Sequence, residues 1–142
     1  MAVEDKWLRH VGEMHSLQSL GLDDTQVTDD SVQLLATLPN LQWLWLDRSQ
    51  VTGQGVARLK ALGNLKMLDL DGLKLKDEDL AHVNQMPNLE TLYLDDTPTS
   101  DAALPHLLKV KRLRHLHLRN TKVTEQGVAD FEKAMPNVTV AR

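Results

Sequence analysis

The stretch Leu89-Glu90-Thr91-Leu92-Tyr93-Leu94-Asp95-Asp96-Thr97 carries the pattern that decides the fold, L-x-x-L-x-L-x-x-T. Its leucine core recurs in one register every 24 residues, in the stretches 17–22, 41–46, 65–70 and 113–118. Copies at a fixed spacing are typical of repeat proteins, in which each unit stacks on its neighbours and buries a continuous core. The sequence therefore predicts a solenoid.

Length and composition set the broad class. The 142 residues suit a single domain over 1–142, and 42% apolar with 25% charged residues is ordinary for a globular protein. A net charge of −4 argues against nucleic acid as the main partner, because phosphate binding needs clustered cations. The absence of cysteine excludes disulfides and thiolate metal sites.

Targeting signals give only a default location. No apolar run reaches membrane-spanning length, and residues 1–6 lack the basic-then-apolar layout of a signal peptide. We therefore expect no membrane contact and a cytoplasmic location by default. Any segment that exports or anchors the natural protein would lie outside this chain.

Within each repeat, the residue pattern predicts a short strand followed by a helix. Leucines at pattern positions 4 and 6 point inward while positions 3, 5 and 7 face outward, as alternation in a strand requires. Thr28, Thr52 and Thr124 then stand where helix N-caps are expected, and an apolar residue before each cap pairs with one in the first turn. We therefore expect parallel strands on the concave side of the solenoid and short helices on its convex side.

The ends and the fourth repeat depart from the regular unit. Residues 1–16 align with the back half of a repeat, so they form either a helix that caps the stack or the remnant of a longer array. Residues 17–137 hold about five repeats, and 138–142 are expected to form a final edge strand. Pro105 predicts a late or distorted helix in the fourth repeat.

The repeat L-x-x-L-x-L-x-x-T-x-V-T-D-x-x-V resembles the bacterial leucine-rich repeats related to the ribonuclease-inhibitor type, and residues 134–140 resemble the ends of such arrays. The resemblance covers essentially the whole chain. It implies an α/β leucine-rich-repeat solenoid that serves as a protein-interaction scaffold, with no cofactor. Leu73 replaces the hydroxyl residue at position 9 in repeat three, so a row of hydroxyls along that edge would be interrupted there.

Aligning the repeats turns the sequence into a map of the strand surface. Trp43 and Trp45 face outward from one strand, and tryptophan and tyrosine are frequent anchors of interfaces. The pair indicates either binding or self-association, or local packing of the rings on the sheet. The outward residues that we predict for the binding face are Trp43, Trp45, Met67, Asp69, Tyr93, His115, His117, Asp47, Asp71, Asp95 and Arg119.

The polar residues on this face allow several interpretations. The aspartates at position 7 could form an acidic track for a basic peptide or a calcium site, or each could bond the backbone of a turn. Asp95 and Arg119 could form a surface ion pair. His115 and His117 share one face, but flanking arginines disfavour a metal and favour a pH-sensitive basic end of the face.

No pattern of catalytic residues is present, since the chain lacks cysteine, a nucleophile elbow and a glycine-rich phosphate loop. We therefore predict a non-enzymatic module that binds an unidentified protein or peptide on the concave face. The alternative is a structural segment or terminal cap of a larger assembly. Self-association through Trp43 and Trp45 fits either hypothesis.

Overall fold

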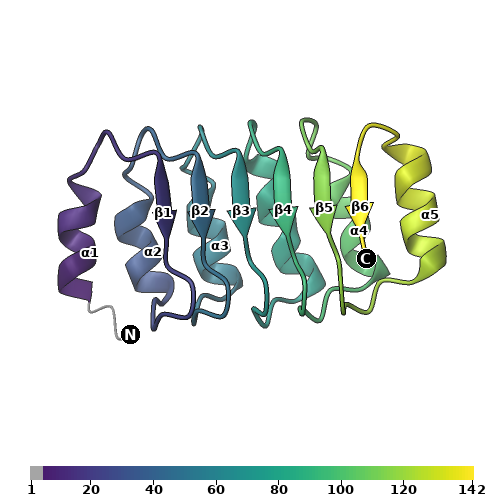
Figure 1. Ribbon diagram of the computed structural model, residues 1–142, viewed down its shortest axis with the longest axis horizontal. Coiled ribbons are helices and arrows are strands. Elements are labelled where there is room, and N and C mark those ends of the chain that lie inside the picture. The colour runs from purple at the N-terminus through teal and green to yellow at the C-terminus, as the bar shows by residue number, and fades with distance from the viewer. Residues whose placement is uncertain (1–4) are drawn as a thin grey trace.

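The protein is described by a computed structural model that covers residues 5–142. Within this range, parallel strands form one sheet in chain order, and each strand pairs with the next at an offset of one repeat (Figure 1). The strands are β1 (Ser19–Gly21), β2 (Trp43–Trp45), β3 (Met67–Asp69), β4 (Thr91–Tyr93), β5 (His115–His117) and β6 (Thr139–Ala141). The alignment of the repeats in the sequence is therefore the same as the pairing of the strands in the sheet.

Helices cover one side of this sheet and leave the other side to solvent (Figure 1). They are α1 (Asp5–Gly12), α2 (Asp29–Leu35), α3 (Gly53–Leu59), the 3-10 helices η1 (Asp77–Gln85) and η2 (Asp101–Ala103), α4 (Leu104–Leu107) and α5 (Glu125–Ala134). We call the uncovered side the sheet face. It comprises the first and third residues of each strand and the residue two places after the strand, such as Asp47 after β2 or Asp71 after β3.

One continuous apolar core lies between the sheet and the helices. The central leucine of β2, β3, β4 and β5 is fully buried in each case, as alternation within the strands predicts. The expected apolar staples are buried as well, for example Val27 with Val32 and Leu75 with Leu80. The predicted α/β solenoid of leucine-rich repeats is confirmed.

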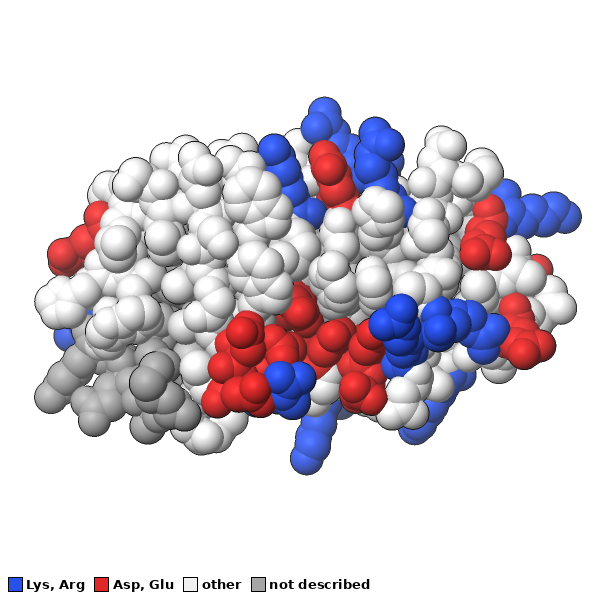
Figure 2. Space-filling view, in the orientation of Figure 1, with Lys and Arg blue, Asp and Glu red and all other residues white. Residues whose placement is uncertain are grey.

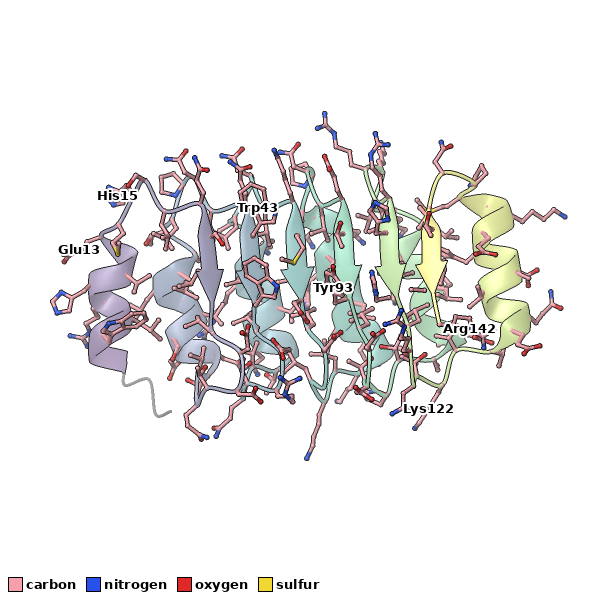
Figure 3. All side chains as sticks on the ribbon, in the orientation of Figure 1. Glu13, His15, Trp43, Tyr93, Lys122 and Arg142 are labelled. Atoms are coloured by element: carbon pink, nitrogen blue, oxygen red, sulfur yellow. The ribbon has the colours of Figure 1, made fainter. Side chains whose placement is uncertain are left out.

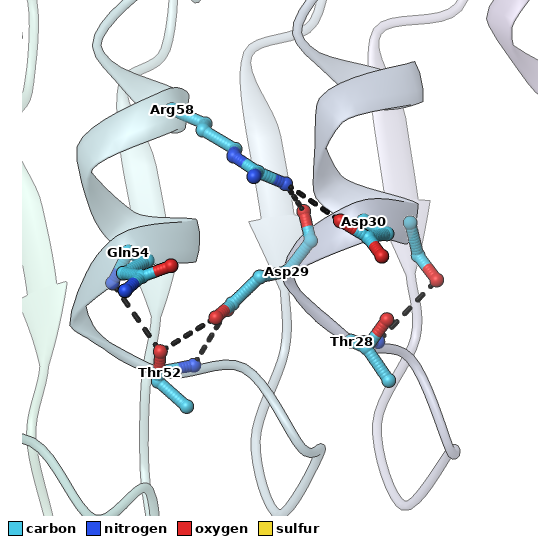
Figure 4. A network of polar contacts seen from close by, with 7 residues as sticks. Thr28, Asp29, Asp30, Thr52, Gln54 and Arg58 are labelled. Carbon is cyan, nitrogen blue, oxygen red and sulfur yellow. Dashed lines mark hydrogen bonds and ion pairs between the residues drawn. The ribbon is translucent and has the colours of Figure 1, made fainter.

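Carboxylates link the start of one helix to the start of the next. Asp29 in α2 accepts the backbone N–H (2.8 Å) and the hydroxyl (2.6 Å) of Thr52, the N-cap of α3 (Figure 4). Arg58 reaches back from α3 to the Asp29 carbonyl and to the Asp30 carboxylate, 3.2 Å away. The same link recurs in the pairs Asp77–Ser100 and Asp101–Thr124.

The link fails between the second and third repeats. Gly53 occupies the place of the linking aspartate, and Lys76 at the next cap gives its N–H to Asp79 of its own helix at 2.8 Å. A Cβ on Gly53 would lie 2.1 Å from the Asp79 carboxylate. The glycine therefore leaves the space that Asp79 needs to cap η1.

The fourth repeat and the two ends differ from a regular unit. The helix of the fourth repeat is split into η2 and the four-residue α4. Pro105 lies in the first turn of α4, where the backbone hydrogen bond that proline cannot donate is not needed. In α1, Leu8 and Val11 are buried, but Met14 is 52% exposed because the helix ends at Gly12. Met14 therefore does not continue the buried face of α1.

The position-9 hydroxyls do not form a row between repeats. Thr25, Thr97 and Thr121 each donate to the carbonyl three residues earlier in their own repeat, at 2.6–2.8 Å. They close the turn after the strand, and Leu73 fills the same place with a buried apolar side chain. Within residues 5–142, every helix is too short or too polar to span a lipid bilayer.

Candidate binding face

Aromatic side chains gather on the sheet face at the middle strands. Trp43 is 37% exposed, and Trp45 is half-buried two residues further along the same strand. Tyr93 is half-buried in β4, two strands from Trp43 (Figure 3). Tyr93 stacks on His117 of the next strand, with ring centroids 4.2 Å apart and planes 29° from parallel. The face thus presents large rings that keep part of their surface in solvent, and the Tyr93 ring is stacked on its neighbour.

Two residues predicted to be exposed on this face are covered. Met67 is 8% exposed and Asp69 is 9% exposed, although both lie on the solvent side of β3. The reason lies in the register, which pairs Met67 with Trp43, and Asp69 with Trp45 on one side and Tyr93 on the other. Rings on the adjacent strands shield the smaller side chains between them.

Carboxylates form a patch where the middle strands end, and Figure 2 shows it as one acidic area with basic side chains at its edge. We call this set the acidic cluster, and its members are Asp23, Asp47, Asp69, Asp71 and Asp95. Asp47 is buried and only 8% exposed, whereas Asp71 and Asp95 are half-buried. Asp47 therefore also departs from the exposure predicted for it.

Backbone N–H groups bind several of these carboxylates. Asp69 accepts from the N–H of Asp71 at 3.0 Å, and Asp71 accepts from the N–H of Asp95 at 2.7 Å. Asp95 in turn accepts from the N–H of Arg119 at 2.7 Å. The predicted ion pair between these two residues is therefore replaced by a hydrogen bond from the backbone of Arg119. The interpretation of these aspartates as turn-stabilising groups therefore holds for part of the cluster.

The charges of the cluster are only partly compensated. Burial, with the nearby Asp69 charge, raises the pKa of Asp71 to about 7. Burial and a hydrogen bond with Asp23 raise the pKa of Asp47 to about 6, and burial raises the pKa of Asp69 as well. A region with raised carboxylate pKa values attracts a cation, because a cation favours the ionised form.

Arg48 is a basic residue inside this region, and it was not among the residues predicted for the binding face. Its guanidinium binds Asp24 through two hydrogen bonds of 2.6 and 2.8 Å and also contacts Asp47 at 2.7 Å. The hydrogen bonds from Arg48 hold the pKa of Asp24 below its usual value. The spacing of 24 residues between Asp24 and Arg48 is a signal that could have revealed this pair.

The histidines lie at the other end of the face. His115 is exposed, and burial lowers the pKa of the half-buried His117, so that it is neutral near pH 7. Across residues 5–142, no three histidine or acidic side chains are arranged to hold a metal ion. The structure therefore brings together the tryptophans, Tyr93 and the carboxylates, and places His115 and Arg119 at the margin.

Solved structures of other proteins share this architecture. An internalin C2 of Listeria monocytogenes is 30% identical over 94% of this chain and 55% of its own, with a TM-score of 0.71. A second Listeria internalin is 23% identical over 94% of this chain and 36% of its own, with a TM-score of 0.75. The chain is a leucine-rich repeat protein of bacterial type.

A leucine-rich repeat protein of Leptospira interrogans also matches, at 19% identity and a TM-score of 0.62 over 93% of this chain and 38% of that one. The leucine-rich repeat protein described here thus spans between about a third and about half of the length of these structures. No protein-family model and no curated protein sequence matches it. Its relation to the ribonuclease-inhibitor type of repeat stays a prediction.

Proposed function

We propose that the sheet face binds a protein or peptide partner, with Trp43, Trp45 and Tyr93 as its apolar anchors. The observation that carries this proposal is Trp43, which is 37% exposed on the same face as the half-buried rings of Trp45 and Tyr93. Aromatic rings that are held in place lose little conformational freedom on binding, which is why tryptophan and tyrosine dominate binding energy at interfaces. Repeat solenoids offer such faces as extended binding surfaces, and the bacterial structures that this chain resembles share its architecture.

The mechanism that we propose combines burial with charge. A segment of the partner covers the rings and removes their exposed surface from water, which provides affinity. The acidic cluster lies where the middle strands end (Figure 2), and the exposed Arg119 follows β5. Charges of opposite sign at two places on one face select the orientation of the partner more than they add affinity.

The test uses the immobilised domain to capture proteins from a native lysate, followed by affinity measurements with the captured protein in purified form. Trp43→Ala and Trp45→Ala should each weaken binding by about 2 kcal/mol, or roughly 30-fold, while Trp43→Ala shifts the free energy of unfolding by less than about 1 kcal/mol. Trp7→Ala is the matched control, because Trp7 is 53% exposed on α1, away from the sheet face. Unchanged affinity in both sheet-face variants would refute the proposal, whereas a large drop in stability would make the rings structural.

A second candidate function is a segment within a larger assembly, and one observation favours it. Trp7 and Met14 are 53% and 52% exposed at the α1 end of the array. Exposed large apolar side chains at the end of a solenoid suit contact with a further unit. Loss of self-association in Trp7→Ala, measured by solution mass, would support this candidate, and a monomer at all concentrations would contradict self-assembly.

A further inference from the structure

Asp69 occupies a singular place on the sheet face, between two aromatic side chains. It is paired in register with Trp45 of β2 and with Tyr93 of β4, and neighbouring strands lie about 4.8 Å apart. Trp45, Asp69 and Tyr93 therefore form a continuous row across three strands. Asp69 is 9% exposed in its place between these two residues.

The charge of Asp69 has little compensation. Its Oδ1 accepts the N–H of Asp71, which is a neutral donor. Within residues 5–142, the ion pairs of Arg48 are made with Asp24 and Asp47 and do not reach Asp69. Asp69 and Asp71 thus stand side by side as carboxylates whose neighbours are other carboxylates and aromatic rings.

We propose that this row recognises an arginine side chain of the partner, whose guanidinium packs on the rings of Trp45 and Tyr93 and pairs with the carboxylates of Asp69 and Asp71. This inference rests on the proposed function, since it names the partner side chain that the same face takes. A guanidinium is planar, stacks on aromatic faces and pairs with carboxylates through a fixed fork of donors. An ammonium group lacks the planar shape and the fork, so arginine fits this row better than lysine.

The protonation of the cluster supports the assignment. The pKa values of Asp69 and Asp71 are raised because these groups are buried beside other carboxylates. The charged groups around them are Asp23, Asp47 and Asp95, with Arg48 as the nearby cation. A bound guanidinium supplies the missing positive charge and allows both carboxylates to ionise, which a neutral side chain of similar shape does not do.

The surroundings also restrict which partners fit. Arg119 follows β5 and is exposed, so positive charge already occupies the far side of the row. A uniformly basic partner would be repelled there, because like charges across an interface are unfavourable. The partner segment should therefore carry its arginine over β3 without further cations toward β5.

The experiment titrates the ¹⁵N-labelled protein with N-acetyl-arginine-N-methylamide and follows the indole N–H signals of the three tryptophans by NMR. The Trp45 signal and the amides of Asp69 and Asp71 should shift in a saturable manner, with a Kd on the order of 10 mM, while the Trp7 signal stays in place. The citrulline analogue, which keeps the planar shape but lacks the charge, should bind at least about tenfold more weakly. The lysine analogue should also bind more weakly.

Matched variants assign the site. Asp69→Asn should weaken binding about tenfold or more, and Asp71→Asn tests the same row if Asp69→Asn does not fold. Asp130→Asn on α5, an exposed aspartate distant from the sheet face, should leave binding unchanged. Equal binding of citrulline or lysine, no shift at about 100 mM, or titrations unaffected by both substitutions would each overturn the assignment.

This result is separable from the test of the proposed function. If the arginine compound does not bind but Trp45→Ala still loses the captured protein, the arginine assignment alone is wrong. If the compound binds as expected but capture is insensitive to both tryptophan substitutions, the arginine site stands and the proposed use of the tryptophans as anchors is wrong.

Discussion

Replacing Asp71 by asparagine should stabilise the protein at pH 8. The substitution keeps the shape of the side chain, and the asparagine Oδ1 can still accept the N–H of Asp95, which lies 2.7 Å from the Asp71 carboxylate. The substitution removes only the negative charge of Asp71, which lies next to the charge of Asp69. Burial and that neighbouring charge raise the pKa of Asp71 to about 7.

The sign of the effect follows from proton binding. The folded protein holds the Asp71 proton more tightly than the unfolded chain, in which the pKa is near 3.8. The folded state therefore binds more protons between about pH 4 and pH 7, so this group stabilises the fold in acid and the stabilisation is lost as the pH rises through 7. A pKa unit corresponds to about 1.4 kcal/mol, and solvent screening of this half-exposed group reduces the total to roughly 1–2 kcal/mol.

Other groups titrate in the same range, so the difference between two proteins is the quantity to measure. The raised pKa of Asp47 also favours the folded state in acid, whereas the lowered pKa of His117 disfavours it there, because the unfolded chain binds that proton first. Urea denaturation at pH 8 and pH 5 should show Asp71→Asn more stable than the parent at pH 8 by roughly 1–2 kcal/mol, with a smaller difference at pH 5. A variant less stable at pH 8, or a difference independent of pH, would refute the electrostatic account.

Two further predictions concern the core and the break between repeats. Leu92→Ala should lower the free energy of unfolding by roughly 2–5 kcal/mol, because Leu92 is fully buried in β4, and Glu90→Ala should lower it by less than about 0.5 kcal/mol in the same denaturation assay. Similar losses would show that the strand register is wrong. Gly53→Ala should cost about 1 kcal/mol by displacing the Asp79 carboxylate from its cap, and in an Asp79→Ala background it should be neutral or stabilising. An equal cost of Gly53→Ala in both backgrounds would rule out displacement of the cap.

Much of the fold could be predicted because the 24-residue spacing fixes which residues are neighbours. The spacing alone placed Trp45, Asp69 and Tyr93 in one row, and the register of the strands agrees. It could not predict that Asp69 and Met67 are covered, since exposure depends on the rotamers of rings on adjacent strands. Alternation in a strand indicates the side on which a residue lies, not how much of it reaches solvent.

Polar contacts between repeats were harder to predict, because each depends on two residues in different units. The pairs Asp29–Thr52 and Asp24–Arg48 are both visible as periodic spacings, but many other periodic pairs make no contact. Likewise, Asp79 caps η1 from within its own helix, at the joint where Gly53 provides no link. The sequence shows that Gly53 stands in place of the linking aspartate. The effect of this glycine on the cap of η1 becomes clear only when the two repeats are placed together.

The missing link at Gly53 leaves fewer side-chain hydrogen bonds between the second and third repeats than between the first and second. Among the described residues, one side-chain hydrogen bond crosses from residues 41–64 to residues 65–88, from Asn88 to the carbonyl of Gly63 at 2.7 Å. The joint before it is crossed by bonds from Thr52, Arg58, Arg48 and Asn64. In a linear stack each unit contacts only its neighbours, so we expect the second and third repeats to move against each other more easily than the first and second. This joint runs between β2 and β3, and flexing it alters the gap between the Trp45 ring and the Asp69 carboxylate.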